Sequence, residues 1–270
     1  MRAGTQSIER TVRLLKAVAE RKDIGWRLTD LALYCGLGKP TTHRIVKCLV
    51  AERMLRQRPD DRRYVPGPLL FELASALPAY MDFRDAMHLE LAAIARRHHG
   101  YAFLHLRSGS ETVCVDRVGS SPVHPLTIIG TRRPLTQSTA GVAILLALEA
   151  PERERIVAAI RRMKLREAEK RRAQAYTHIL RQSLLQGHAY SLGDVVPGLG
   201  AIAVPLRDLH GQPLGSLGLM GPVVNFSEER LDKGITALTR EAQRLQRSHR
   251  GLIADLAAHP GAEDAVEEEA

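Results

Sequence analysis

Residues 28–49 of the chain are LTDLALYCGLGKPTTHRIVKCL, which predicts two short helices separated by a glycine turn. The first helix would begin at Thr29 or Asp30, both favoured N-cap residues, and would stop at Gly36. Pro40 then falls in the first turn of the second helix, where its missing N–H costs nothing. Two helices joined in this way are typical of a helix-turn-helix.

The residues on both sides extend this motif. Upstream, residues 7–21 carry apolar side chains at helical spacing, which predicts a further helix. Downstream, residues 54–58 and 62–65 are short extended runs on either side of Pro59-Asp60-Asp61, which is a turn signal. A helix, a second helix, a glycine turn, a third helix and a hairpin follow one another in the order of a winged helix-turn-helix.

The positive charge of the chain is concentrated in this segment. The 270 residues carry a formal charge of +9. Residues 1–66 hold 15 Lys and Arg against 7 Asp and Glu, a net charge of +8, which leaves +1 for the remainder. This asymmetry indicates a polyanion-binding module attached to a near-neutral one. A solvated basic surface with no partner is the alternative that charge alone leaves open.

The second helix of the motif is expected to have one apolar and one polar face. At 100° per residue, Ile45, Cys48 and Leu49 form an apolar stripe. The N–H groups at the helix start suit phosphate, Arg44 is long enough to reach base edges, and arginines around the hairpin turn suit phosphates or a minor groove. We therefore predict that the contacts to double-stranded DNA are Thr29, Lys39, Thr41, Thr42, His43, Arg44, Lys47, Arg56, Arg58, Arg62 and Arg63.

The rest of the chain predicts an α+β domain. A joint at residues 66–68 leads into a linker helix at 69–77, which would end at Pro78. Strands are expected at 101–107, 112–118, 123–129, 201–206 and 214–220, with helices between them. Hairpins in place of strict βαβ alternation favour an antiparallel sheet wrapped by helices. We place the winged helix at 1–66, the linker at 67–82, the second domain at 83–252 and a disordered acidic tail at 253–270.

Several classes of protein are disfavoured. No apolar run approaches the roughly 20 residues that span a bilayer, and the N-terminus lacks the apolar region of a signal peptide. Three widely spaced cysteines indicate a reducing compartment, so we expect a cytoplasmic protein without a membrane partner. No acid/base pair or nucleophile constellation is visible, and we predict no catalytic residue, metal ligand or cofactor.

Several stretches together resemble the IclR (isocitrate lyase regulator) family of bacterial transcription factors. They are residues 7–15, 28–49, 63–68, 115–118, 130–135, 138–141 and 198–205, the last leading into 215–222. The resemblance implies an N-terminal winged helix, a linker helix and a GAF-like C-terminal domain that binds a small-molecule effector. It also implies a homodimer or a dimer of dimers on a palindromic operator, with repression as the commoner role.

The resemblance further implies a set of effector contacts, which are Gly130, Thr131, Ser191, Asp194, Ala201, Gly218 and Met220. Members that bind small 2-oxo acids are similar to one another in placing small polar side chains at the positions of Ala201, Gly218 and Met220. Here these three residues offer a carboxylate only backbone N–H groups. A larger or more apolar ligand, such as an aromatic acid, is therefore expected. The alternative is that Met220 merely fills core space.

Two further positions near this site stay open. Arg132 and Arg133 are suited to anchor an acid, but a solvated pair is an equal alternative. Val142 stands where the family has Lys, a change for which we have no functional account.

The function expected from these observations is a DNA-binding regulator that responds to an effector. Two other interpretations stay open. An architectural DNA-binding protein, whose C-terminal domain only oligomerises, would show little sequence preference and no response to ligand. An enzyme that uses the pocket of the sheet domain would turn a ligand over.

Overall fold

The computed structural model describes residues 5–121, 127–162, 167–208 and 210–248. The chain divides into two compact units, Met1–Pro78 and Ala79–Ala270. Within the described ranges, no helix is long and apolar enough to cross a membrane. The predicted acidic tail at 253–270 and the first four residues of the strand predicted at 123–129 lie outside these ranges, and residues 127–129 are not a strand.

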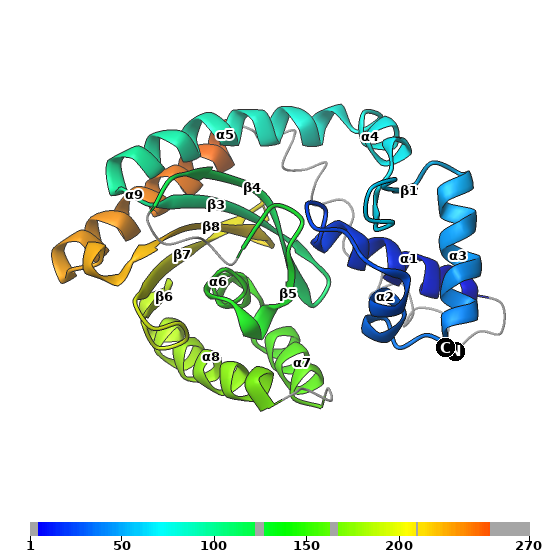
Figure 1. The fold of residues 1–270 in the computed structure, drawn as a ribbon. Coiled ribbons are helices and arrows are strands. Elements are labelled where there is room, and N and C mark those ends of the chain that lie inside the picture. Colours follow the sequence, from blue (N-terminus) through cyan, green and yellow to red (C-terminus); the bar gives the residue numbers. More distant parts are fainter. Residues whose placement is uncertain (1–4, 122–126, 163–166, 209, 249–270) are drawn as a thin grey trace. The chain divides into compact units, whose positions relative to one another are not determined.

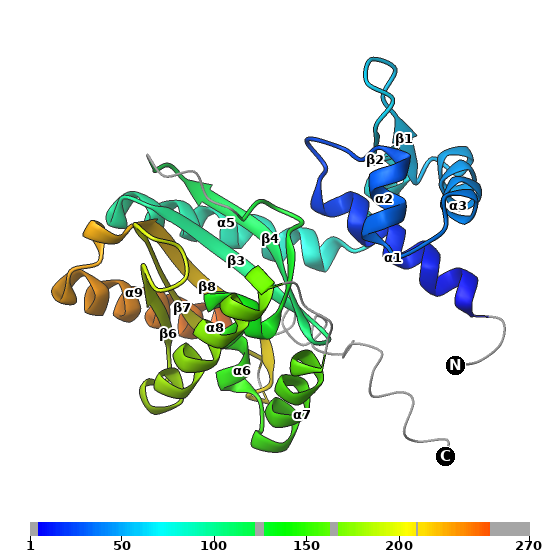
Figure 2. The same cartoon turned by 60° about the horizontal axis from the view of Figure 1, so that its bottom comes forward.

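The first unit is a winged helix (Figure 2). Its elements are α1 (Gln6–Glu20), α2 (Leu28–Tyr34), α3 (Lys39–Ala51), the antiparallel hairpin of β1 (Leu55–Gln57) and β2 (Tyr64–Pro66), and α4 (Pro68–Ala74). The turn after α2 requires Gly36, which has a φ of +63°. The helices and the hairpin occur in the predicted order.

The core of this unit corrects one detail of the prediction. The face of α3 that packs on α1 and α2 is made of Thr42, Ile45, Val46 and Leu49, all buried. These positions follow the i, i+3, i+4, i+7 spacing of a core-facing helix. The predicted apolar stripe was wrong about Cys48, which is exposed because it lies beyond the edge of that face.

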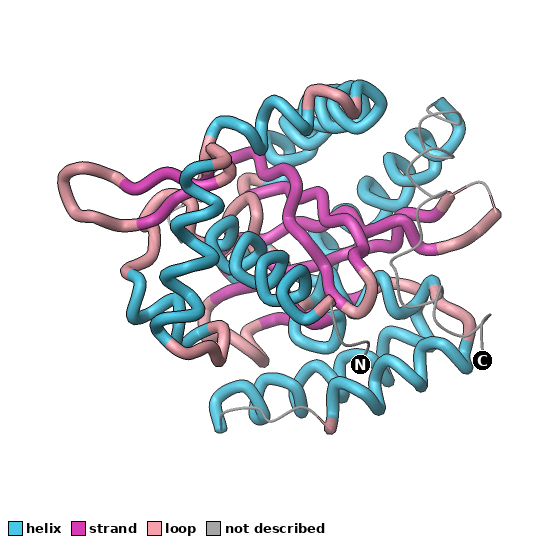
Figure 3. Tube along the Cα trace, turned by 90° about the vertical axis from the view of Figure 1, so that its right-hand side faces the viewer, coloured by secondary structure: helices cyan, strands magenta, loops and turns pink. Residues whose placement is uncertain are grey.

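The second unit contains a six-stranded antiparallel sheet of order β5-β4-β3-β8-β7-β6, whose strands run side by side in Figure 3. The strands are β3 (Tyr101–Ser108), β4 (Glu111–Gly119), β5 (Arg132–Pro134), β6 (Ala189–Leu192), β7 (Leu199–Arg207) and β8 (Pro213–Pro222). The sequence did not predict β5 or β6. The α+β class with an antiparallel sheet is confirmed.

Helices cover both faces of this sheet (Figure 1). The outer face packs on α5 (Pro78–His98) and α9 (Glu228–Ser248). The sheet curls around α6 (Thr139–Ala147), and α8 (Glu167–Gln186) packs against α6; α7 (Ala150–Arg161) precedes α8 in the chain. The sequence placed the end of the linker helix at Pro78, but α4 ends at Ala74 and Pro78 begins α5, because proline is tolerated in the first turn of a helix.

The alternation of side chains along β7 explains why a cavity lies on the inner face of the sheet. Ile202, Val204 and Leu206 of β7 belong to the core beneath α5 and α9. Since successive residues of a strand point to opposite faces, Ala201 and Ala203 point inward. Small side chains at these inward positions leave space between the sheet and the helices that it surrounds.

Candidate nucleic-acid interface and ligand pocket

The packing of α3 determines which of its side chains face solvent. Because the opposite face is buried, Lys39, His43, Arg44 and Lys47 are all exposed, and Thr41 at the helix start is half-buried. Three of the exposed side chains are cationic and the fourth is a histidine. Thr29 at the start of α2 is also exposed. The winged helix therefore presents a row of hydrogen-bond donors on its second motif helix.

Thr42 is the one residue of α3 that the structure removes from the predicted contacts. Its exposed fraction is 0%, and its hydroxyl donates a hydrogen bond to the carbonyl of Gly38 at 3.1 Å. The side chain therefore fixes the first turn of α3 from inside the core. A buried threonine in this position cannot reach DNA.

The four arginines of the hairpin divide into two pairs. Arg56 and Arg62 are exposed. Arg58 turns back: its Nη2 lies 2.7 Å from Asp61 Oδ2, and its Nη1 donates to the carbonyl of Asp23 at 3.1 Å. Arg63 Nε lies 3.5 Å from the same carboxylate oxygen, and its Nη1 donates to the carbonyl of Gly25 at 3.4 Å. Arg58 and Arg63 therefore position the wing, a role that the sequence had not indicated.

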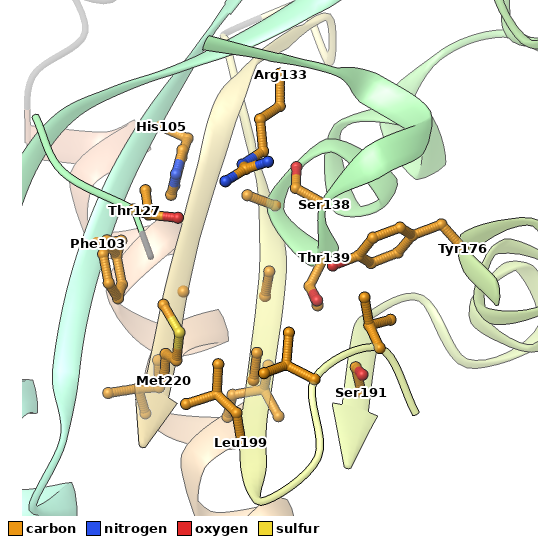
Figure 4. A pocket seen from close by; sticks show the side chains of 18 of the residues that line it. Phe103, His105, Thr127, Arg133, Ser138, Thr139, Tyr176, Ser191, Leu199 and Met220 are labelled. Carbon is orange, nitrogen blue, oxygen red and sulfur yellow. The ribbon is translucent and has the colours of Figure 1, made fainter. Parts of the chain in front are cut away.

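A pocket opens between the inner face of the sheet, α6 and α8 (Figure 4). Its empty volume is about 760 Å³, including space open to solvent. The lining residues are Phe103, His105, Thr127, Arg133, Gln137, Ser138, Thr139, Ala140, Tyr176, Ser191, Val195, Val196, Leu199, Ala201, Ile202, Ala203, Gly218, Leu219 and Met220. Ten of these residues are apolar and eight carry polar side chains, a mixture that suits an organic ligand with polar groups.

Of the predicted effector contacts, Ser191, Ala201, Gly218 and Met220 line this pocket, whereas Gly130, Thr131 and Asp194 do not. The last three residues belong to turns. Gly130 has a φ of +92°, and Thr131 Oγ1 accepts a hydrogen bond from the N–H of Ile128 at 3.1 Å. Asp194 Oδ2 accepts one from the N–H of Leu192 at 2.8 Å. The polar groups of Thr131 and Asp194 therefore stabilise these turns.

The loop that does reach the pocket is the one entering α6. Ser138 is the N-cap of that helix, and its Oγ accepts a hydrogen bond from the N–H of Gly141 at 2.9 Å. Ser138, Thr139 and Ala140 all line the cavity. The signal was present in the sequence: a small polar residue before an apolar helical run marks a helix N-terminus, and such a terminus favours anions.

The two adjacent arginines at this site have different surroundings. Arg132 Nε lies 3.0 Å from Glu111 Oε2, and its Nη2 donates to Ser108 Oγ at 2.7 Å. Arg133 instead lines the pocket, with its guanidinium on the side of His105 (Figure 4). The two arginines therefore do not form a solvated pair. Arg132 is ion-paired with Glu111 on the sheet, and Arg133 faces the cavity.

His105 is a buried titratable group that lines the pocket. Burial, and to a lesser degree the charge of Arg133, lowers the pKa of His105 to about 4. Its ring stacks against that of Phe103, with the centroids 5.7 Å apart. The imidazole is therefore neutral at physiological pH, and its Nδ1 is buried without a hydrogen-bond partner among the described residues.

The chain combines a winged helix that exposes a cationic helix with a separate unit that contains a pocket. This combination is typical of a ligand-sensing DNA-binding regulator. Among the described residues, no group of three or more His, Cys, Asp or Glu is placed to hold a metal ion. Residues 7–59 match the family model of the IclR helix-turn-helix domain, and residues 77–247 match that of the bacterial transcriptional regulator IclR C-terminal domain. The chain belongs to the IclR family of bacterial transcriptional regulators.

Several known proteins are similar to this chain over most of its length. The chain is 23% identical over 243 residues to the HTH-type transcriptional regulator KdgR of Escherichia coli, covering 90% of this chain and 92% of that protein. An IclR regulator from Alicyclobacillus acidocaldarius superposes with a TM-score of 0.69 at 22% identity, covering 89% and 97%. An IclR homologue from Microbacterium hydrocarbonoxydans, complexed with 4-hydroxybenzoate, gives 0.65 at 22% identity, covering 94% and 100%.

Proposed function

We propose that this regulator is a cytoplasmic repressor that binds a palindromic operator and changes its affinity for that operator when an aromatic or otherwise apolar acid fills the pocket. The observation that carries the proposal is the exposed cationic face of α3. Because the opposite face of this helix is buried, only the cationic face can contact a partner. Residues 1–66 would bind DNA, 67–82 would link, and 83–252 would sense the effector.

The α3 helix is the element that would enter the major groove. Arg44 and Lys47, with His43 beside them, would reach base edges, because they project from the middle of the exposed face. Lys39 and Thr41 at the helix start suit phosphate oxygens. Arg56 and Arg62 on the wing, and Thr29 on α2, would add contacts to the backbone or the minor groove.

A second copy of the chain is the partner proposed for the apolar surface of the first unit. The described side chains of α4 include no buried residue, and Phe71 is 70% exposed. Leu73 on the same helix and Leu77 after it are exposed as well. Apolar side chains gathered in this way mark contact surfaces. A twofold dimer, or a dimer of such dimers, would match the symmetry of a palindromic operator.

The effector would act by favouring one arrangement of the dimer over another. A ligand that binds both arrangements equally shifts nothing, so the acid must bind the operator-competent and the released forms with different affinities. The pocket supports an apolar acid because ten of its nineteen lining residues are apolar. The 4-hydroxybenzoate complex of the Microbacterium relative supports the same class.

A footprint of the full-length protein on the DNA upstream of its own gene tests this proposal, repeated with aromatic acids and with 2-oxo acids. We expect a protected palindrome whose protection is altered by at least one aromatic acid and by none of the small 2-oxo acids. Binding without sequence preference and without response to any acid would favour the architectural alternative. Consumption of an acid during the incubation, followed by chromatography, would favour an enzyme.

A further inference from the structure

The charge of the chain beyond the winged helix is distributed unevenly. Residues 253–270, here called the acidic segment, carry six Asp and Glu and no Lys or Arg. The part before that segment, residues 67–252, holds 24 Lys and Arg against 17 Asp and Glu, a net charge of +7. The small net charge of residues 67–270 is therefore the sum of a cationic body and an acidic segment.

One face of α9 carries a row of cations, which lies beside the apolar face that packs on the sheet. At 100° per residue, the members of this row fall within an arc of about 100°, and all of them are exposed. They extend over about 25 Å of the helix. The row consists of Arg230, Lys233, Arg240, Arg244 and Arg247.

The end of α5 adds further basic groups to this row. A hollow with an empty volume of about 1240 Å³, including space open to solvent, lies between the last turn of α5 and α9. Arg97 and His98 line it from α5, and His98 Nε2 is buried without a hydrogen-bond partner among the described residues. A second hollow, at Arg244 and Arg247, shares Arg240 with the first. We call the row, together with Arg97, the α9 cationic face.

Only part of this face is neutralised by carboxylates. Lys233 lies 2.6 Å from Glu229, and Arg244 pairs with Glu90 and with Glu241. Asp232 is the one carboxylate that lines the larger hollow. Like charges that stand close together attract a polyanion. The members of the face that form no ion pair with a described carboxylate are Arg97, Arg230, Arg240 and Arg247.

We propose that the acidic segment of the same chain binds the α9 cationic face and thereby keeps DNA away from it. Five of its six carboxylates fall within residues 263–269. Glu263 follows Ser248, the last residue of α9, by fifteen residues, which can span up to about 50 Å. Arg230, the far end of the row, is about 27 Å from Ser248 along the helix. The segment can therefore reach the whole row, at the high effective concentration of a tethered ligand.

This contact has a consequence for DNA binding, and it does not depend on what fills the pocket. A cationic face outside the winged helix attracts any duplex, because phosphate contacts carry no sequence information. A tethered polyanion that occupies this face leaves the winged helix as the part of the chain that binds DNA. The acidic segment would therefore improve the preference for operator over other DNA.

Two combined variants of the full-length protein separate this face from net charge. The face variant carries Arg97→Gln, Arg230→Gln and Arg240→Gln. The control variant removes the same charge from exposed positions on α7 and α8. Its changes are Arg155→Gln, Arg171→Gln and Arg181→Gln. Circular dichroism melts report whether each variant folds as the wild type does.

Zero-length carbodiimide cross-linking, followed by trypsin and mass spectrometry, tests the contact itself. Lys233 is the one amine of the row, so the wild type should yield a peptide that joins Lys233 to a carboxylate of residues 263–269. The yield should fall by about tenfold in 1 M salt, where charges more than about 3 Å apart are screened. It should fall similarly in the face variant, which keeps Lys233, and should stay within about twofold of wild type in the control variant.

Fluorescence anisotropy with a scrambled duplex tests the consequence. A full-length chain with a neutralised acidic segment should bind this duplex about tenfold more tightly than the wild type, with a slope of log K against log salt steeper by about 2–3. Adding the face changes should abolish this gain, whereas adding the control changes should leave most of it. The neutralising changes are Glu263→Gln, Asp264→Asn, Glu267→Gln, Glu268→Gln and Glu269→Gln.

Three results would overturn the proposal. The first is a wild-type protein without a cross-link between Lys233 and the acidic segment. The second is a gain in affinity for the scrambled duplex that is absent, or that the face and control changes reduce equally, because the segment would then act through net charge alone. The third is a cross-link that, in a mixture of ¹⁴N- and ¹⁵N-labelled protein, joins only peptides from different chains, since the segment would then bind a second copy. If the face variant does not fold, the salt dependence of the wild-type cross-link decides the point.

Discussion

Arg58 and Asp61 form an ion pair in the turn of the hairpin that makes the wing, with 2.7 Å between Nη2 and Oδ2. The same carboxylate accepts a hydrogen bond from the backbone N–H of Arg63 at 3.1 Å. Arg58 also donates to the carbonyls of Asp23 and Ile24, in the loop before α2. Asp61 thus connects the turn of the hairpin, through Arg58, to the helical part of the winged helix.

Replacing this carboxylate should loosen the wing without removing any cationic side chain. We expect Asp61→Ala to lower the urea concentration at the midpoint of unfolding, because Arg58 and the Arg63 N–H lose their shared acceptor. Asp60→Ala removes the neighbouring exposed carboxylate and is the control. Equal midpoints for the two variants, measured by circular dichroism, would mean that the Arg58–Asp61 pair does not hold the wing.

Arg62 differs from Arg58 because it is exposed. If it contacts phosphate, Arg62→Ala should reduce the slope of log K against log salt by about 1 and leave the preference for operator over random DNA unchanged. Fluorescence anisotropy with the operator and with a scrambled duplex, at four salt concentrations, measures both quantities. An unchanged slope would remove Arg62 from the phosphate contacts.

Arg44 and Thr42, two residues apart on α3, should respond in opposite ways. Arg44→Ala should weaken specific binding by about 1–3 kcal/mol if the side chain reads a base. Thr42→Val keeps the shape but loses the hydroxyl that donates to Gly38, so it should lower the free energy of unfolding and change the operator affinity little. Anisotropy titrations and urea unfolding of both variants separate the two effects; an operator defect in folded Thr42→Val would contradict the burial argument.

Cys48 provides a chemical probe of the same helix. It is exposed, whereas Cys35 and Cys114 are buried, and burial raises the pKa of the Cys35 thiol to about 11. A maleimide should therefore label Cys48 first, and operator DNA should slow that reaction by about tenfold if α3 lies in the groove. Mass spectrometry after timed labelling gives the rates. The same rate with operator as with a scrambled duplex would argue against the proposed docking of α3.

The winged helix could be predicted from the sequence because its signals are local. Helical spacing, a glycine turn, Pro40 at a helix start and a Pro-Asp-Asp turn each depend on a few neighbouring residues. The misplacement of Cys48 shows the limit of a single helical wheel: the boundary of the buried face depends on what packs against it. Thr42, which was expected to contact DNA, lies inside that boundary and is buried.

The pocket could be predicted only in part. Strands β5 and β6 span three and four residues, which is too short for a periodic pattern. Without β5, nothing in the sequence decides whether Arg132 or Arg133 faces inward, since that follows from pairing with β4. Four of the seven effector contacts that the resemblance implied line the pocket. It also implied that the loop at Gly130 borders the pocket, whereas the loop that does so is the one at the helix start, Ser138.

The buried histidine of the pocket gives the chain a pH dependence of definite sign. The pKa of His105 is about 4 in the folded protein and near 6.5 when unfolded, so between these values the unfolded chain binds more protons. The free energy of unfolding should therefore rise with pH from about 4 to 6.5 and level off above, and this site contributes about 3 kcal/mol over the full window.

Comparison of the wild type with His105→Gln isolates this contribution. His98, whose pKa is also lowered, chiefly by burial and further by Arg97 and His99, is present in both proteins and cancels in the difference. We expect the difference in unfolding free energy, from urea titrations at pH 4.5, 5.5, 6.5 and 7.5, to grow with pH up to about 6.5, because only the wild type gains stability as that proton is lost. A difference that is constant over the four pH values would show that His105 titrates as in the unfolded chain.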